Sequence, residues 1–244
     1  MKQSFFNITY ELSVPEVHRG IDRALAEGTP TYICVADGNI LTMVHNDLEY
    51  RKVVNGAMFS ICDSSWVPVY IDRLYGFRPQ QYCGSQIFED LIGMRKYRMM
   101  FMGGSPDVLG GLREKLSQTD SRIADMPFVE LPFRSVDDFD YEAIAAQVNA
   151  YGPDVVWVAL GAPKQEIFAS RLAPLLGRGV VIPVGAVFNF YSGVGVKRAP
   201  GWMVKCHLEF LYRIFSEPRK QLRRCWLILK TLPRAYREEK GKSR

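Results

Sequence analysis

The chain has 244 residues, of which 48% are hydrophobic and 23% are charged. This is the composition of a globular protein with one large domain, with or without an appendage, and it excludes disordered, collagen-like and small disulfide-stapled classes. No run of about 18 uncharged apolar residues occurs, so we expect no transmembrane helix. Residues 1–10 lack the apolar region of a secretory signal. Five scattered cysteines without a CxxC pair argue against a zinc site or a disulfide framework and favour the reducing cytoplasm.

The positive charge is concentrated at the C-terminal end. The whole chain carries 31 Lys and Arg against 26 Asp and Glu, a formal charge of +5. Residues 197–244 hold fourteen of these basic residues and four acidic ones, a charge of +10, so the preceding residues carry −5. Such asymmetry predicts a polyanionic partner, either a nucleic acid or an anionic membrane surface. The alternative is a solvated basic helix with no partner.

From residue 31 to residue 184, short apolar runs alternate with helical patterns. In chain order, the expected elements are a strand at Thr31–Val35, a helix at Leu41–Ala57, a strand at Phe59–Cys62, helices at Trp66–Tyr75 and Gln86–Tyr97, a strand at Met99–Met102, a helix at Pro106–Leu116, a weak strand at Phe128–Leu131, a helix at Tyr141–Ala150, a strand at Val155–Leu160, a helix at Lys164–Leu176 and a strand at Val180–Val184. Strands separated by helices predict an α/β fold: a Rossmann-like, mostly parallel sheet with helices on both faces.

The C-terminal part has no clear strand. We expect a catalytic α/β domain over residues 1–196 and a basic helical appendage over residues 197–244, with helices at Trp202–Phe215 and Gln221–Leu232. In the second helix, an apolar face holds Leu222, Cys225, Trp226 and Leu229, while most of the Lys and Arg lie elsewhere. A basic amphipathic helix of this kind is typical of a membrane interface. A helix docked with its apolar face in the core is the competing interpretation.

Polar and glycine-rich turns follow the predicted strands. They are Asp37–Asn39, Asp63–Ser65, Gly103–Pro106, Gly161–Glu166 and Gly185–Asn189. Because ligands of open parallel sheets bind beyond the carboxyl ends of the strands, these turns predict one binding edge.

Two of these turns suit a nucleotide. Gly103 and Gly104 open a helix, where a phosphate can approach the backbone and the helix N-terminus; a tight connection is the simpler explanation. Lys164 and Gln165 begin the next-but-one helix and could reach a pyrophosphate or a sugar hydroxyl, although a surface lysine is equally ordinary. The dinucleotide GxGxxG and Walker motifs are absent from the sequence.

Asp63 is the best candidate for a catalytic base. A carboxylate at the end of a buried strand lies near the predicted edge and could take a proton from an attacking hydroxyl. Asp37 could do the same. From the residues alone, helix N-capping is the favoured role of both.

Read together, these stretches resemble the WecG/TagA/CpsF family of bacterial glycosyltransferases (glycosyltransferase family 26). The most specific match is the segment 193–219, where Lys197-Arg198-Ala199-Pro200-Gly201-Trp202-Met203 and the following Leu208-Glu209-Phe210-Leu211-Tyr212-Arg213 and Glu217-Pro218-Arg219 are similar to the family's KRAP-x-WM, LEWLYR and EP-x-R. Gly161-Ala162-Pro163-Lys164-Gln165-Glu166 matches its GxPKQE, and residues 101–106 match its strand-GG-x-P turn. The likeness covers most of the chain.

The resemblance implies an inverting transfer of a hexose or N-acetylhexosamine from a UDP-sugar to a sugar on a polyprenyl diphosphate, at the cytoplasmic membrane during cell-surface polysaccharide synthesis. It implies that Asp63 is the general base. The implied donor-binding residues are Asp37, Asn39, Gly103, Gly104, Gly161, Lys164 and Gln165. The implied acceptor- and diphosphate-binding residues are Lys197, Arg198, Arg213, Arg219, Arg223 and Arg224. Because guanidinium groups can stabilise the departing UDP, we expect no metal cofactor.

Three positions depart from the family pattern. Asp37-Gly38-Asn39 stands where Thr-x-Asn is usual, Asp63 is followed by Ser64 instead of Gly, and Gln81 and Gln86 replace an Arg and an Asp. These changes put the usual N-acetylmannosamine-type donor in question.

Two other classes remain as alternatives. The first is a nucleotide-binding module with a basic tail for nucleic acid or membrane and no transferase activity, but it leaves residues 161–166 unexplained. The second is a nucleotide-sugar epimerase or dehydrogenase, against which the missing GxGxxG argues. The expected partners are therefore a UDP-sugar, a lipid-linked acceptor and an anionic membrane on its inner face, without nucleic acid; a homo-oligomer is compatible with the sequence.

Overall fold

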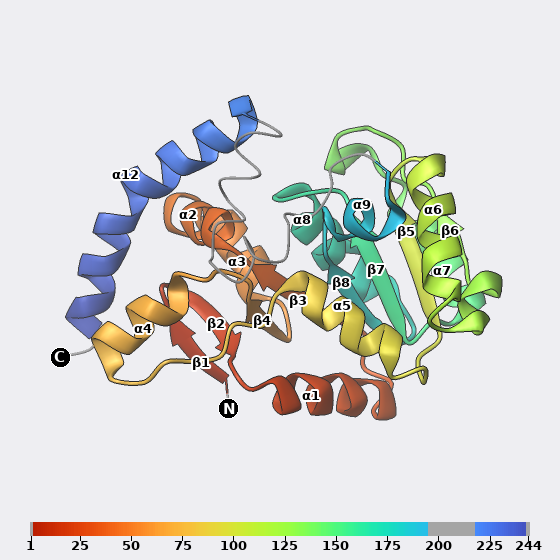
Figure 1. Cartoon of the computed structure of the whole chain (residues 1–244), viewed down its shortest axis with the longest axis horizontal. Helices are drawn as coiled ribbons and strands as arrows, with labels where there is room; N and C mark the ends of the chain where they lie inside the picture. The colour runs from red at the N-terminus through yellow and green to blue at the C-terminus, as the bar shows by residue number, and fades with distance from the viewer. Residues whose placement is uncertain (1, 195–217, 243–244) are drawn as a thin grey trace.

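A computed structural model of the chain describes residues 2–194 and 218–242, with α12 side chains from residue 221 onward. An eight-stranded sheet in the order β1-β2-β4-β3-β8-β7-β5-β6 runs through the molecule (Figure 1). The strands are β1 (Lys2–Phe5), β2 (Ile8–Glu11), β3 (Thr31–Ala36), β4 (Phe59–Cys62), β5 (Met99–Gly103), β6 (Phe128–Val129), β7 (Val155–Ala159) and β8 (Val180–Pro183). Only β1 is antiparallel to its neighbour; the other pairs are parallel. The predicted α/β class is confirmed.

Helices cover both faces of this sheet. They are α1 (Val14–Ala26), α2 (Gly38–Asn46), α3 (Leu48–Asn55), α4 (Val67–Tyr75), α5 (Gly84–Gly93), α6 (Pro106–Ser117), α7 (Tyr141–Tyr151), α8 (Lys164–Leu172), α9 (Val187–Ser192) and α12 (Pro218–Lys242). One buried cluster joins the sheet to α2, α3, α4, α7 and α8, and a second joins it to α1, α5, α6 and α9. The architecture is therefore a three-layer sandwich with two cores.

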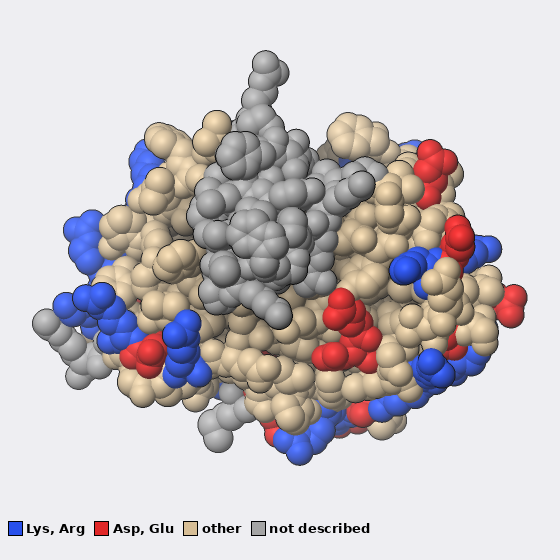
Figure 2. Space-filling model, viewed as in Figure 1, with Lys and Arg blue, Asp and Glu red and all other residues tan. Residues whose placement is uncertain are grey.

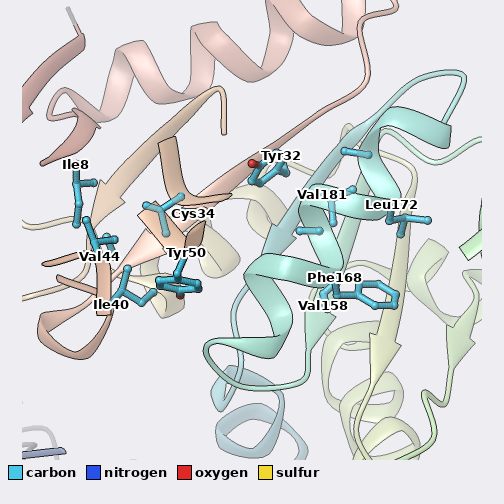
Figure 3. Close-up of a cluster of buried hydrophobic side chains, with 14 of the residues drawn as sticks. Ile8, Tyr32, Cys34, Ile40, Val44, Tyr50, Val158, Phe168, Leu172 and Val181 are labelled. Carbon is cyan, nitrogen blue, oxygen red and sulfur yellow. The ribbon is translucent and has the colours of Figure 1, made fainter. Parts of the chain in front are cut away.

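The central strands are apolar on both sides because both faces are covered. In β3, Tyr32 and Cys34 belong to the first core, whereas the alternate residues Ile33 and Val35 belong to the second. Figure 3 shows Tyr32 and Cys34 with side chains of α2, α3 and α8 in the first core. Cys34 and Cys62 are both buried. Burial raises the pKa of both thiols.

The predicted helix at Leu41–Ala57 is wrong in one respect. Two helices, α2 and α3, occupy this range, and they meet at Asp47. The Asp47 backbone is extended, and its carboxylate accepts hydrogen bonds from the backbone N–H groups of Glu49 and Tyr50. N-capping by this aspartate starts a new helix where the apolar spacing runs on without a break.

Other predicted boundaries are close. The strands β3, β4, β5, β7 and β8 lie within one residue of their expected ends. The helix expected at Gln86–Tyr97 begins earlier and ends at Gly93, before Arg95, which has a φ of 51°. The strands of the β1–β2 hairpin, α1 and the short α9 are among the elements that were not predicted. The helix expected at Trp202–Phe215 and the domain boundary at residues 196/197 lie outside the described residues.

Helix α12 packs on the body through a face with both polar and apolar residues. Gln221, Thr231 and Glu239 are buried on this face together with Ala235. The helix contacts α2 and α4 (Figure 1). Near the start of α2, a Cβ built on Gly38 would lie 3.4 Å from Ile228 Cδ1, so the two helices approach closely there.

Hydrogen bonds hold the C-terminal half of α12. Glu239 is 1% exposed and accepts from the Phe6 N–H at 2.9 Å and from the Tyr75 hydroxyl at 2.7 Å. Asn46 of α2 donates to the Thr231 hydroxyl at 3.0 Å, and Lys242 donates to the Asn7 side chain at 2.8 Å. These contacts tie the helix to α2, to α4 and to the turn between β1 and β2.

The opposite face of α12 carries the apolar residues that the sequence places together. Leu222, Trp226 and Leu229 are 57%, 61% and 71% exposed. The alternative in which this face fills the core is therefore wrong. Basic side chains surround the exposed stripe, and the Lys230 ammonium lies 5.2 Å from the centre of the Trp226 ring. Figure 2 shows Lys and Arg gathered on the side of the molecule formed by α12.

Candidate active site

The candidate site lies at the carboxyl ends of the neighbouring parallel strands β3 and β8, which form the topological switch point of the sheet. These neighbouring strands lead into helices on opposite faces, α2 in the first core and α9 in the second. A crevice opens at such a switch point in doubly wound sheets. Register places Ala36 beside Cys62, so the turns beginning at Asp37 and Asp63 are adjacent. The Asp63 N–H donates to the Ala36 carbonyl at 3.1 Å.

Asp63 is oriented by the start of α5. Its Oδ1 accepts the backbone N–H of Gly84 at 2.9 Å. It does not cap the following helix α4, whose first N–H groups, on Trp66 and Val67, point to the Ser64 hydroxyl instead. The capping role favoured from the residues alone is therefore wrong for α4. This hydrogen bond holds the Asp63 carboxylate against the start of α5.

The two glutamines that depart from the family pattern support this arrangement. Gln81 Nε2 donates to the Asp63 carbonyl at 2.9 Å, and Gln86 Oε1 accepts the Cys83 N–H at 2.9 Å. The Tyr82 N–H donates to the Cys62 carbonyl at 3.0 Å. Residues 81–86 are thus fastened along the end of β4, and both glutamines position the backbone around Asp63.

Asp37 acts as a helix cap. Its carboxylate accepts the Ile40 N–H at 2.8 Å and begins α2. Asn39, in the first turn of α2, is 8% exposed. The structure therefore brings Asp37 and Asn39 to the same edge as Asp63, with the Asp37 carboxylate serving its own helix.

Gly103 and Gly104 have structural reasons to be glycine. Their φ angles are 101° and 84°, and a Cβ on Gly103 would lie 2.5 Å from the carbonyl oxygen of Ala159 in β7. The helix that follows, α6, is capped by the Ser105 hydroxyl. The turn lies at the carboxyl edge beside β7, and close packing between neighbouring strands accounts for its first glycine without a ligand.

In the Gly161–Glu166 turn, the side chains of Lys164 and Gln165 point in different directions. Lys164 donates to the Arg134 carbonyl, and its ammonium lies 5.2 Å from the Phe139 ring centre and 5.4 Å from that of Phe133. It is therefore turned toward the loop after β6. Gln165 is 6% exposed; its Oε1 accepts the Gly161 N–H at 3.0 Å and lies 3.0 Å from a Cβ built on Gly185. Gln165, unlike Lys164, lies at the switch point.

Glu166 is the site residue whose part the sequence does not reveal. It is 0% exposed and accepts from Gln165 Nε2 at 2.8 Å and from the Tyr50 hydroxyl at 3.0 Å. Burial raises its pKa to about 7, and the Asp37 charge acts in the same direction. Figure 3 shows the Tyr50 ring between α2 and α8 in the first core. The only sequence signal for this contact is a charged residue at an otherwise buried helix position.

The predicted acceptor-binding residues are only partly described. Lys197, Arg198 and Arg213 lie outside the described residues, and Arg219 lies in α12 at a position whose side chain is not described. Arg223 is exposed. Arg224 is half-buried, one helical turn before Ile228, which packs near Gly38 at the start of α2. Arg224 therefore points toward the body near the Asp37 turn, and Arg223 points away from it.

The described ranges, 2–194 and 218–242, contain neither a cluster of metal ligands nor a membrane-spanning helix. No three His, Cys, Asp or Glu side chains in them gather as ligands for a metal ion. No helix in them has both the length and the hydropathy to cross a bilayer.

The sequence model of the glycosyl transferase WecG/TagA/CpsF family matches residues 4–244. The chain belongs to this family. This membership confirms the resemblance of the three motifs. The chain is thus a glycosyltransferase, and neither a nucleotide-binding module without activity nor an epimerase.

Two relatives are informative. One, from Bacillus subtilis strain 168, is 32% identical over 206 residues, covering 80% of this chain and 75% of the relative. The other, from Bacillus spizizenii strain W23, is 30% identical over 203 residues with the same coverage. Both are called N-acetylglucosaminyldiphosphoundecaprenol N-acetyl-β-D-mannosaminyltransferase.

Proposed function

We propose that this glycosyltransferase moves a hexose or N-acetylhexosamine from a UDP-sugar to a sugar carried on a polyprenyl diphosphate, with inversion at the transferred carbon. The observation that carries the proposal is the position of Asp63 at the carboxyl edge of the sheet, where Gly84 holds it and the Asp37 turn adjoins it. The names of the two Bacillus relatives support a lipid-linked acceptor. Residues of the switch point would bind the donor.

Asp63 is the proposed general base. In an inverting transfer, the acceptor hydroxyl attacks the anomeric carbon as UDP leaves, and its proton must pass to a base. The Gly84 N–H, at the positive end of α5, favours the ionised carboxylate that this role requires.

The proposal assigns different partners to the two neighbouring arginines of α12. Arg224, on the body side, would bind the acceptor diphosphate or the departing UDP, since a guanidinium group matches phosphate oxygens in pairs. Arg223, on the outer side, would face lipid head groups. Arg224→Ala should lower kcat or raise the acceptor KM by tenfold or more, roughly the loss of one charge-assisted pair, whereas Arg223→Ala should mainly weaken vesicle binding. Equal effects of both variants on transfer would contradict the assignment.

If arginines stabilise the leaving diphosphate, no divalent metal is needed. We therefore propose metal-independent transfer, at an unchanged rate in excess EDTA. A rate that falls with EDTA and returns with Mg²⁺ or Mn²⁺ would contradict this part of the proposal.

The exposed face of α12 is the proposed membrane contact, on the cytoplasmic side of the membrane. Leu222, Trp226 and Leu229 are exposed among basic side chains on a helix that the body already holds in place. An apolar stripe with cationic flanks matches an anionic bilayer surface. The helix is thus preorganised and would bind without first detaching from the body.

Vesicle sedimentation tests this contact. Replacing Leu222, Trp226 and Leu229 together by serine should abolish binding to anionic vesicles, and added salt should weaken binding of the unmodified chain. Phe133→Ser is the control, because Phe133 is fully exposed in the loop after β6, which lies away from α12 (Figure 1). Binding that survives the triple substitution would exclude the outer face of α12 as the contact.

Product analysis tests the reaction itself. The chain is incubated with a panel of UDP-sugars and a short polyprenyl-diphosphate N-acetylglucosamine acceptor, and the product mass identifies the donor. Asp63→Asn should lower the rate by roughly 10²–10⁴ while leaving the circular dichroism spectrum unchanged. A folded Asp63→Asn protein with full activity would remove Asp63 from the mechanism, and no product with any donor would refute the proposed reaction.

A further inference from the structure

A buried hydrogen-bond chain links α3 to the Gly161 turn. The Tyr50 hydroxyl donates to Glu166 Oε2 at 3.0 Å, and Gln165 Nε2 donates to Glu166 Oε1 at 2.8 Å. Gln165 Oε1 then accepts the Gly161 N–H at 3.0 Å. The Gln165 N–H in turn donates to the Gly161 carbonyl at 3.1 Å, so turn and side chain hold each other. Both Tyr50 and Glu166 are buried.

The carboxylate decides which way the Gln165 amide faces. An ionised carboxylate only accepts hydrogen bonds, so it requires the NH₂ end of the amide. The backbone N–H of Gly161 only donates, so it requires the oxygen end. Reversing the amide would place oxygen against the carboxylate and NH₂ against the N–H, and both contacts would be repulsive. The Glu166 charge therefore fixes the orientation shown by the structure.

One hydrogen of the Gln165 amide is left for a ligand. The nitrogen carries two hydrogens, and the described residues provide it with one acceptor, Glu166. The side chain lies against Gly185 in the turn after β8, at the carboxyl edge of the sheet. A sugar hydroxyl or a phosphate oxygen of a donor bound at this edge could accept the remaining hydrogen.

We propose that Glu166 is a positioning residue that acts through Gln165: its carboxylate holds the Gln165 amide so that one N–H faces the sugar-nucleotide donor. This inference rests on the proposed function, because it takes a UDP-sugar as the ligand of the switch point. The inference adds a second residue to the donor site: Glu166, which is buried and does not touch the substrate, determines donor affinity through Gln165.

Because the proposed role of Glu166 depends on its ionisation, the proposal can be tested through the pH dependence of donor binding. Burial raises its pKa to about 7, whereas the hydrogen bonds from Gln165 and Tyr50 act to lower it. The titratable groups around it are Tyr50 on α3, Asp37 after β3 and Cys34 in β3. Burial raises the pKa of both Tyr50 and Cys34. As the pH falls through about 7, Glu166 takes up a proton and can donate as well as accept, so only the Gly161 N–H still selects the amide orientation.

Calorimetric binding of a UDP-N-acetylhexosamine between pH 6 and pH 8 tests the proposal. Its diphosphate does not titrate in this range, and a binding measurement does not depend on the proposed base. We expect the affinity at pH 8 to exceed that at pH 6 by about tenfold, roughly the effect of one hydrogen bond to a charged group. Glu166→Gln should bind weakly at both pH values, and Asp63→Asn should keep the pH dependence.

Two further variants make the result decisive. In a Gln165→Ala background, Glu166→Gln should have no additional effect on affinity, because the proposed route runs through Gln165. Tyr50→Phe removes a hydrogen bond that lowers the Glu166 pKa, so the midpoint of the pH dependence should move to higher pH. This second variant decides the matter should Glu166→Gln fail to fold.

The outcomes separate the inference from the proposed function. A Glu166→Gln protein with unchanged affinity and pH dependence, a further loss in the Gln165→Ala background, or an unmoved midpoint in Tyr50→Phe would overturn the inference alone. If the unmodified chain bound no UDP-sugar at all, the proposed donor class would fail, and the inference would fail with it.

Discussion

Gly103 lies at the carboxyl edge of the sheet, and the fold alone requires glycine at this position, whether or not a ligand binds there. Its register partner is Ala159 in β7, and its φ of 101° is one that residues with a side chain rarely adopt. The position a Cβ would take is 2.5 Å from the Ala159 carbonyl oxygen. Two independent constraints, backbone conformation and contact with a neighbouring strand, thus require glycine here.

Gly103→Ala should accordingly destabilise the chain by roughly 2–5 kcal/mol, from backbone strain together with the overlap on the β7 backbone. The free energy of unfolding in urea measures the effect. Gly110→Ala is the matched control: Gly110 lies exposed within α6, and nothing lies within 4 Å of its Cβ position. It should stabilise the chain by about 0.5–1 kcal/mol. Similar stabilities for the two variants would refute this account of Gly103.

At the residue scale, the sequence predicts where Asp63 lies but not what holds it. The buried run Phe59–Cys62 is enough to place the next carboxylate at the sheet edge. Its partner, the Gly84 N–H, comes from a helix start 21 residues later. Likewise, the contact between Glu166 and Tyr50 spans 116 residues. Local patterns contain no information on such long-range pairs.

At the element scale, α12 reverses the usual use of an amphipathic helix. Its body-facing side holds Gln221, Thr231, Ala235 and Glu239, and its outward side holds the apolar stripe. Hydrogen bonds contribute to this attachment together with apolar contacts such as the one between the Tyr236 and Tyr70 rings. Glu239 is the most constrained of these contacts, since it is buried and bonded to two different elements.

Glu239→Ala should therefore leave the Phe6 N–H and the Tyr75 hydroxyl without their acceptor, at a cost of about 1–3 kcal/mol for each group that stays buried. Hydrogen exchange measured along the chain should show α12 and the β1–β2 turn opening more often. Arg237→Ala is the control on the exposed side of the same helix and should change stability by less than about 0.5 kcal/mol. Unchanged protection of α12 in Glu239→Ala would show that other contacts hold the helix.

Elements differ in how far the sequence predicts them. The buried strands are continuous apolar runs between turns, so β3, β4, β5, β7 and β8 are recognisable. The β1–β2 hairpin is not, because its turn uses Phe6 and Asn7 at positive φ with no glycine to mark it. Which side of α12 faces the body is also not predictable, because the helix docks by its less apolar face.

At the scale of the whole molecule, both termini of the described chain meet at one end. Lys242 and Glu239 contact the turn between β1 and β2, and β1 forms the outer edge of the sheet (Figure 1). The basic appendage is thus joined to the catalytic body at the N-terminal hairpin as well as through α2. The basic side chains of α12 lie on one flank of the molecule, while the rest of the face in Figure 2 carries both basic and acidic side chains.

If the exposed Leu222, Trp226 and Leu229 stripe binds a bilayer as proposed, it has a kinetic consequence. An enzyme held on a bilayer meets its lipid-linked acceptor by diffusion in two dimensions, so the acceptor's mole fraction in the membrane sets the encounter rate. Diluting the acceptor with inert lipid, at constant total acceptor, should slow transfer in proportion, while detergent-dispersed acceptor should remove this dependence. Chains with the stripe replaced by serine should respond to bulk acceptor concentration alone. The outer face of α12 would then determine whether the transfer rate depends on the bulk concentration of the acceptor or on its surface density in the membrane.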